Sequence, residues 1–101
     1  MNNIFKSFNP VFENRVRLAV MSILAVNDRM EFNALKEMLD LTDGNLASHI
    51  AMLEKNGYLA VKKRFVGKKP QTSYTATPAG KRAFEQHLAA LEKFIKSNLQ
   101  Q

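Results

Sequence analysis

Apolar side chains recur at intervals of three and four residues in four segments of the chain, which is the period of a helix buried on one side. These segments are residues 9–27, 33–39, 42–56 and 78–99. Between residues 58 and 66 the apolar period falls to two, and a run rich in Thr and Tyr follows at 71–77. Both features are typical of strands. The pattern therefore predicts four helices, a hairpin between the third and fourth, and a short extended segment at "RMEF".

Polar capping residues and turn formers mark where these elements begin and end. Asn and Thr side chains accept hydrogen bonds from a first helical turn, and Pro is tolerated there. The expected helix starts are Asn9 with Pro10, Asn33, Thr42, and Thr77 with Pro78. Gly57 is expected to end the third helix, because a left-handed residue after a helix is easiest for Gly. The turn signal "GKKP", residues 67–70, is expected to form the tip of the hairpin.

The predicted order is helix, strand, helix, helix, strand, strand, helix. The second and third helices are separated by about three residues, 40–42. Two helices joined by such a turn and followed by a hairpin form a helix-turn-helix with a wing. The expected fold class is therefore α+β, mainly α with a small antiparallel β-sheet.

Two stretches carry a resemblance to a known family: "LTDGNLASHIAMLEKNGYL", residues 41–59, and "VGKKPQTSYTATPAGKRAF", residues 66–84. Together they resemble the compact winged-helix DNA-binding domains of prokaryotic transcriptional regulators, of the broad MarR/ArsR-like type. The resemblance covers about residues 16–95, and the length of the chain fits a single domain over residues 1–101. The resemblance implies a homodimer that binds a pseudo-palindromic operator in double-stranded DNA, and the absence of cysteine fits a cytoplasmic protein. The resemblance leaves the operator, the direction of regulation and any effector open, and it calls for no cofactor.

One face of the third helix carries short polar side chains where a solvated helix usually carries Glu and Lys. In helix-turn-helix docking the second helix of the motif lies in the major groove, where short donors and acceptors reach base edges. We therefore expect recognition helix 43–56 to read bases in that groove. The predicted contact residues are Thr42, Gly44, Asn45, Ser48 and His49. An exposed polar face without a ligand is the alternative.

Four neighbouring residues receive other assignments. Asp43 is expected to stabilise the positive end of the helix dipole, because a carboxylate repels phosphate. Met52, the last residue on this face, is expected to pack against the wing or the second helix. Arg15 and Arg17 in the first helix are given no role in DNA binding.

Positive charge is concentrated in one part of the chain. The protein has 101 residues and a net charge of +6. Residues 42–82 hold eight Lys and Arg against two acids, and the rest of the chain is neutral. This distribution indicates a polyanion partner, with a solvated surface as the alternative. The wing, residues 58–77, is expected to contact flanking backbone or the minor groove through Lys62, Arg64, Lys68, Lys69 and Thr72.

The last helix has more apolar surface than one core needs. Two adjacent stripes run along it, one through Leu88 and Leu91 and the other through Ala90 and Phe94. Monomers rarely expose a contiguous apolar patch, so residues 78–99 are expected to form a dimerisation helix. The predicted interface is Phe5, Phe8, Phe12, His87, Leu91, Phe94 and Ile95. Which stripe forms it stays open, and His87 is also expected to be partly buried in its own chain.

Several function classes find no support in the sequence. The chain has no cysteine, which excludes disulfides and thiolate chemistry, and its two histidines have no acidic cluster beside them. No apolar run is long enough to span a bilayer, and the first residues do not form a signal peptide. A Gly-rich phosphate loop and a catalytic triad are absent, so an enzyme is not expected. The competing hypotheses are a winged helix that binds another protein, or one that binds DNA or RNA without sequence preference.

Overall fold

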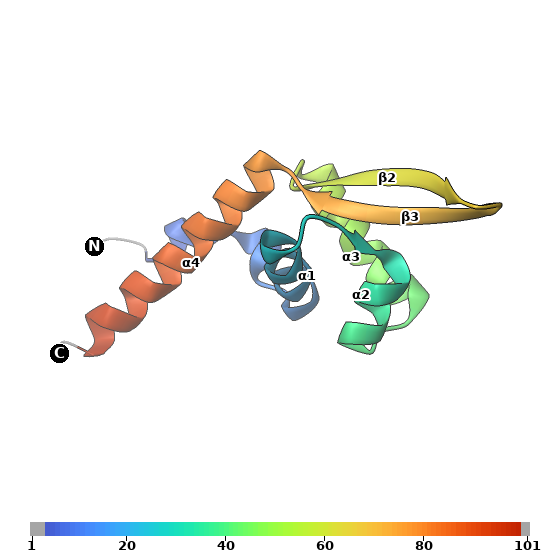
Figure 1. The fold of residues 1–101 in the computed structure, drawn as a ribbon. Coiled ribbons are helices and arrows are strands. Elements are labelled where there is room, and N and C mark those ends of the chain that lie inside the picture. The colour runs from blue at the N-terminus through green and yellow to red at the C-terminus, as the bar shows by residue number, and fades with distance from the viewer. Residues whose placement is uncertain (1–3, 100–101) are drawn as a thin grey trace.

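The structure is a computed structural model that describes residues 4–99 of the chain, shown in Figure 1. Its helices are α1 (Arg15–Val26), α2 (Phe32–Leu39), α3 (Asp43–Lys55) and α4 (Pro78–Leu99), and its strands are β1 (Met30–Glu31), β2 (Leu59–Val66) and β3 (Lys69–Ala76). Two short 3₁₀ turns, η1 (Ile4–Ser7) and η2 (Pro10–Phe12), precede α1. The predicted order and the α+β class are confirmed.

The first helix begins later than its sequence pattern indicates. Asn9 does accept a hydrogen bond from the amide of Val11, but it starts only the 3₁₀ turn η2. Asn14 then adopts an extended backbone, and its side chain accepts from the amides of Val16 and Arg17. The start predicted at Asn9 is therefore wrong for α1, because a second Asn cap lies nearer the helix.

The second helix also starts differently, whereas the turn and the third helix follow the prediction. Helix α2 begins at Phe32 without a side-chain cap, so Asn33 lies inside the helix and does not cap it. Asp40 takes a left-handed conformation and ends α2. Thr42 caps α3 as predicted, by accepting from the amide of Asn45 at 3.2 Å. Gly57 has a φ of +74°, which confirms the expected left-handed stop.

The three-stranded antiparallel sheet has the order β1-β3-β2. Val66 pairs with Lys69, so the hairpin turn consists of Gly67 and Lys68 alone. Lys69 and Pro70, predicted to lie in the tip, instead belong to β3. Gly67 has a φ of +65°, as expected for the first position of a type II′ turn, whose twist matches that of the flanking strands better than the twist of a type I or II turn.

The hydrophobic core lies between α1, α3, the base of the sheet and the start of α4. Its largest fully buried apolar side chains are Phe12, Val20, Met21, Leu24, Leu35, Leu46 and Leu53. Phe12 comes from η2, stacks on Tyr58 with ring centroids 5.4 Å apart, and packs edge-on against Phe84 of α4. The segment before α1 therefore completes the core and ties α4 to it.

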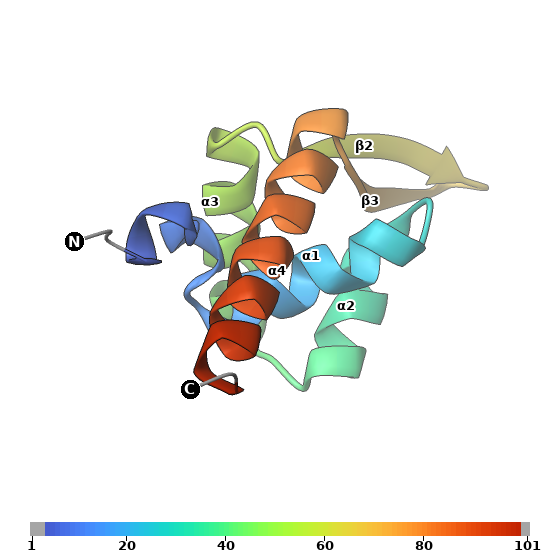
Figure 2. The same ribbon diagram turned by 90° about the vertical axis from the view of Figure 1, so that its left-hand side faces the viewer.

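The molecule is elongated, with extents of 59 × 26 × 21 Å. Figure 1 shows the reason: the β2–β3 wing projects from one end of the helical body, and α4 projects from the other. Figure 2, looking toward the α4 end, shows the N-terminal turns beside α4 and the wing extending away behind. The two projections leave the exposed surfaces of the wing and of the distal half of α4 far apart.

Candidate nucleic-acid interface

Helix α3 presents one buried and one exposed face. Leu46, Ile50 and Leu53 are buried in the core, as their spacing predicts. The opposite face exposes Asn45, Ser48 and Met52, together with three small residues: Gly44, Ala47 and Ala51. Met52 is 42% exposed, so part of its side chain stays open on this face, and its packing against the wing or α2 stays a prediction. The small residues leave the backbone of this face open to close approach.

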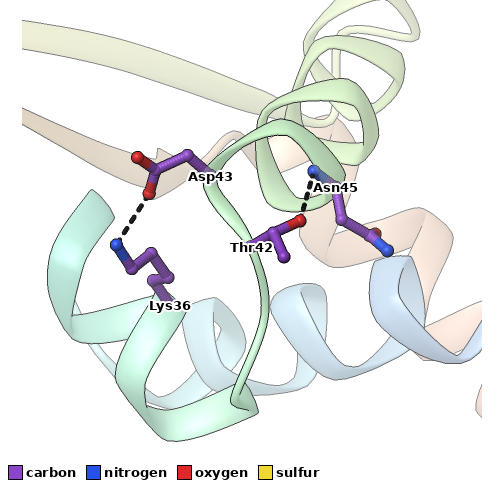
Figure 3. A network of polar contacts seen from close by, with 4 residues as sticks. All are labelled: Lys36, Thr42, Asp43 and Asn45. Carbon is purple, nitrogen blue, oxygen red and sulfur yellow. Dashed lines mark hydrogen bonds and ion pairs between the residues drawn. The ribbon is translucent and has the colours of Figure 1, made fainter.

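Thr42, Asn45 and Ser48 form a short polar line along the start of α3. The hydroxyl of Thr42 is engaged in the cap, as Figure 3 shows. Ser48 donates its hydroxyl to the carbonyl of Asn45 at 3.0 Å, which leaves its oxygen lone pairs as acceptors. The side-chain amide of Asn45 makes no hydrogen bond within residues 4–99. It is therefore a free donor and acceptor at the N-terminal end of α3.

Asp43 has a partner that the sequence does not reveal. Its carboxylate oxygen Oδ1 lies 2.8 Å from Nζ of Lys36 on α2, across the turn between the two helices (Figure 3). The pair adds to the expected interaction with the helix dipole and neutralises the one acid in the first turn of α3. Lys36 therefore belongs to this surface. Sequence reasoning missed it because no local pattern links it to a residue seven positions later.

His49 lies at the edge of the exposed face, where α3 meets α1. It is half-buried, and its Nδ1 is 3.1 Å from a terminal nitrogen of Arg17. Arg17 is anchored in turn, because its Nε donates to the carbonyl of Val11 at 2.7 Å. Burial, and then the neighbouring Arg17 charge, lower the pKa of His49. Arg17, which was not expected to take part in DNA binding, thus contacts one of the residues predicted to lie at this surface.

The wing carries its charges on both faces, and every one is exposed. Lys62 and Arg64 share one face, as alternation along β2 predicts, and Arg64 donates to the side chain of Gln71 across the hairpin at 2.9 Å. Lys68 lies in the turn, Lys69 begins β3, and Thr72 is half-buried. The predicted wing residues are thus gathered on one projecting hairpin.

An apolar group at the wing tip was not predicted. Phe65 is 75% exposed and lies opposite Pro70, next to the half-exposed Val66. Alternation places Phe65 on the same face as the buried Leu59. Phe65 nevertheless lies nearer the tip of the hairpin, beyond the helices that pack on this face. The alternation of a strand shows on which face a residue lies, but it does not show where along the strand the core ends.

Two residues must be removed from the predicted dimer interface. Phe12 is 1% exposed and His87 is 7% exposed. Nδ1 of His87 accepts from the backbone amide of Asn9 at 3.0 Å, and its ring packs against Phe8 and Phe12. These contacts lie within one chain, so the sequence pattern mistook an internal seam between the N-terminal segment and α4 for an intermolecular one. His87 was expected to be partly buried, and the structure buries it almost completely.

The same seam decides which stripe of α4 is covered. Phe8 packs edge-on against Phe94 with ring centroids 6.1 Å apart, and both are half-buried, so they line the seam. The other stripe stays exposed beyond Phe84. Its side chains are between 39% and 79% exposed: Leu88, Leu91, Ile95 and Leu99. Phe5, near the same end of the molecule, is 63% exposed and contacts Phe8.

Residues 4–99 contain no group of three or more His, Asp or Glu that could hold a metal ion. Within the same range, no helix combines the length and the apolar character that crossing a bilayer requires.

Comparison with known proteins decides the family. The sequence profile of the winged helix DNA-binding domain matches residues 16–95. The chain belongs to this family. A relative from Methanocaldococcus jannaschii, an uncharacterized protein, is 33% identical over 87 residues, which make up 86% of this chain and 95% of the relative. The protein is therefore a DNA-binding protein of transcription regulation.

Solved structures agree with the winged-helix assignment. A transcriptional regulator homologue from Pyrococcus horikoshii superposes with a TM-score of 0.83 at 33% identity, covering 93% of this chain and 91% of its own. Bacillus subtilis PadR in complex with operator DNA superposes with a TM-score of 0.64 at 15% identity, covering 72% of this chain and 47% of PadR. The latter likeness is one of fold alone.

Proposed function

We propose that this winged-helix protein is a homodimeric, sequence-specific regulator that binds double-stranded DNA with α3 in the major groove. The observation that carries the proposal is the exposed face of α3, which combines a free amide on Asn45 with small residues on either side. Such a face allows the helix to approach base edges closely. The operator complex of the similarly folded PadR supports the same use of the fold.

Within this proposal the two parts of the surface have different tasks. Asn45 reads bases, for which an Asn amide pairs well with N6 and N7 of adenine, and Ser48 and His49 add further contacts. Thr42 and Gly44 bring the start of α3 close to the sugar-phosphate backbone. The wing supplies contacts that do not depend on sequence, to flanking phosphates or the minor groove, through Lys62, Arg64, Lys68, Lys69 and Thr72.

The exposed stripe of α4 supports a two-fold dimer. Leu88, Leu91 and Ile95 lie on successive turns of one helix face, and each of them is between 39% and 49% exposed. A second copy of the chain can cover this face with the same face of its own α4, which is the symmetric solution. Phe5 and the Phe8–Phe94 seam lie at the same end and would flank the pair. Residues 78–99 would then act as the dimerisation helix and bring two copies of α3 about 34–36 Å apart, one turn of DNA.

Selection of bound sequences from a random duplex library at moderate salt tests the whole proposal. The expected result is an inverted repeat whose half-sites are about one helical turn apart. Enrichment of a single half-site would retain sequence-specific binding and refute the dimer. Binding without enrichment, falling steeply with salt, would instead show a module that binds nucleic acid without preference, and competition with RNA would then identify which nucleic acid it prefers.

Variants separate base reading from backbone contacts. Asn45→Ala is expected to weaken binding to the selected site and to leave the dependence of affinity on salt concentration unchanged, because it removes no charge. Lys68→Ala with Lys69→Ala is expected to weaken all duplexes alike and to flatten the salt dependence. Equal loss on random DNA for Asn45→Ala would refute its base-reading role.

A further inference from the structure

We propose that Arg17 is a positioning residue, which holds His49 as the neutral imidazole protonated at Nε2. Helix α3 then presents a ring N–H donor to an acceptor on the DNA. This inference rests on the proposed function, because it assigns a task to one residue of the proposed interface. The state of the ring can nevertheless be measured in the protein without DNA.

The contact between Arg17 and His49 determines which ring nitrogen carries the proton. A guanidinium group has only donors and stays protonated at any physiological pH. The imidazole Nδ1 that lies 3.1 Å from it must therefore be the acceptor. Because a neutral imidazole has one N–H, that proton resides on Nε2.

Arg17 is held in place well enough to impose this choice. Its Nε donates to the carbonyl of Val11 in the segment before α1, at 2.7 Å. Its own amide donates to the side chain of Asn14, so the residue also belongs to the capped first turn of α1. The guanidinium therefore bridges the N-terminal segment and α3, and can meet His49 without a further ordering step.

The other ring nitrogen of His49 is available. No hydrogen bond within residues 4–99 uses Nε2 of His49. No buried side-chain nitrogen or oxygen in the described part of the chain lacks a partner, so an unpartnered Nε2 on this half-buried residue must reach solvent. His49 lies one turn after Asn45 on α3, so its N–H is displayed beside the proposed base-reading amide.

The neutral state matters for specificity. A cationic imidazolium donates from both nitrogens and attracts any phosphate, which adds affinity without sequence preference. A neutral ring with one N–H donates a single hydrogen bond, so it favours a DNA site with one suitably placed acceptor. That acceptor can be N7 or O6 of a purine, O4 of thymine, or a single phosphate oxygen. Burial of the ring and the Arg17 charge both disfavour the cation, since both lower the pKa of His49.

The first test measures the tautomer in the free protein. Long-range proton–nitrogen NMR of the histidine side chains distinguishes a protonated Nε2 from a protonated Nδ1. We expect His49 to be protonated at Nε2 alone in the wild type at pH 7.5. In Arg17→Met we expect it to shift to a mixture of tautomers. A wild-type ring protonated at Nδ1, or a ring unaffected by Arg17→Met, would overturn the proposal.

The second test measures binding to the selected operator. Arg17→Met is expected to weaken it about tenfold, the effect of one hydrogen bond, with little change on random DNA. Arg15→Met is the matched control, because it removes the same charge from an exposed position two residues away, and it is expected to cost less than about threefold. Equal losses of operator affinity in the two variants would show that Arg17 acts only through its positive charge, which would refute the proposal. Thermal unfolding of each variant checks that the fold is retained.

Two replacements of His49 separate its two nitrogens. His49→Gln places an amide N–H near the position of Nε2 and is expected to stay within about threefold of the wild type. His49→Asn retains an acceptor for Arg17 but does not reach as far, and is expected to lose about tenfold. In the His49→Gln background, Arg17→Met should lower the affinity for the operator no more than Arg15→Met does. The reason is that the amide N–H of Gln does not depend on Arg17 to hold its proton. The reverse order of the two His49 variants would contradict the proposal.

The operator itself identifies the acceptor. Base analogues that each lack one major-groove acceptor, and methylphosphonates at single positions, are compared for wild type and His49→Asn. The substitution that removes the difference between the two proteins marks the partner of Nε2 as a base or a phosphate. If no substitution removes it, His49 does not donate to DNA. If the wild type selects no operator at all, the proposed function fails, whereas the tautomer measurement still reports on Arg17.

Discussion

The carbonyl oxygen of Tyr58 occupies the space where a Cβ at position 80 would lie. Gly80 is buried in the first turn of α4, and Tyr58 lies between α3 and β2. Thr77 completes the junction: its amide donates to the carbonyl of Tyr58, and its hydroxyl donates to the carbonyl of Gly57. The same hydroxyl accepts from the amide of Gly80, as predicted for the cap of α4. The start of α4 therefore docks directly on the segment that leaves α3.

Gly80→Ala is expected to destabilise the protein by about 3 kcal/mol, because the new methyl group meets backbone that cannot move aside cheaply. Urea unfolding measures the change. Gly44→Ala is the control, since a Cβ there meets no atom within 4 Å and Ala favours the helix by up to about 1 kcal/mol. A Gly80→Ala protein as stable as the wild type would show that α4 can shift away from Tyr58.

Asn14→Ala is expected to destabilise the protein by about 1 kcal/mol, because the side chain satisfies two amides at the start of α1. Asn33→Ala is the matched control: this Asn lies inside α2 and caps nothing, so its loss should be neutral or slightly stabilising. Thermal or urea unfolding of both variants decides between them. Equal effects would mean that the Asn14 cap contributes nothing.

Asp43→Asn is expected to raise the affinity for any duplex, because it removes a negative charge next to the proposed interface and releases Lys36 to contact phosphate. The exposed ion pair adds little stability, so unfolding should change by less than about 1 kcal/mol. Affinity on random DNA at two salt concentrations measures the effect. In the Lys36→Ala background the gain should shrink; a gain of the same size would exclude Lys36 from the mechanism.

The stability of the protein is expected to depend on the protonation of His49. Its pKa in the folded protein lies below the ordinary value of 6.5, through burial and then Arg17, so the unfolded chain binds the proton more readily. The neutral ring therefore makes its full contribution to the free energy of unfolding above about pH 6.5. This contribution is lost as the pH falls through the lowered pKa of His49 in the folded protein. Urea unfolding between about pH 8 and pH 5 should show a steeper loss for the wild type than for His49→Gln. Parallel curves would show that the ring titrates alike in both states.

Leu91→Glu or Ile95→Glu is expected to convert the proposed dimer into a monomer, because each places a charge in the exposed apolar stripe of α4. Sedimentation or light scattering measures the mass. Gln86→Glu is the control, since this exposed residue lies on the opposite side of the same helix. A wild-type monomer at micromolar concentration, or a dimer that survives both substitutions, would exclude this stripe as the interface.

Elements with a local cause could be predicted from the sequence. The period of Leu46, Ile50 and Leu53 identified the buried face of α3, because helical spacing alone determines which residues share a side. Thr42 and Thr77 were recognised as caps, since each bonds to an amide three residues away. Gly57 was recognised as a stop by its conformational freedom. The helix-turn-helix with a wing followed from the order of such elements, whereas the family was indicated by the resemblance of residues 41–59 and 66–84.

Contacts between distant segments were decided only by the tertiary structure. Both Asn9 and Asn14 cap a turn in the structure, and Phe12 lies buried between them in a 3₁₀ turn, so α1 begins only after the second. Two apolar stripes on α4 are equivalent in sequence until Phe8 covers one of them. Arg17 and His49, 32 positions apart, carry no mark of their contact. Local propensity acts through neighbours along the chain, whereas burial and partner choice depend on which surfaces the completed fold brings together.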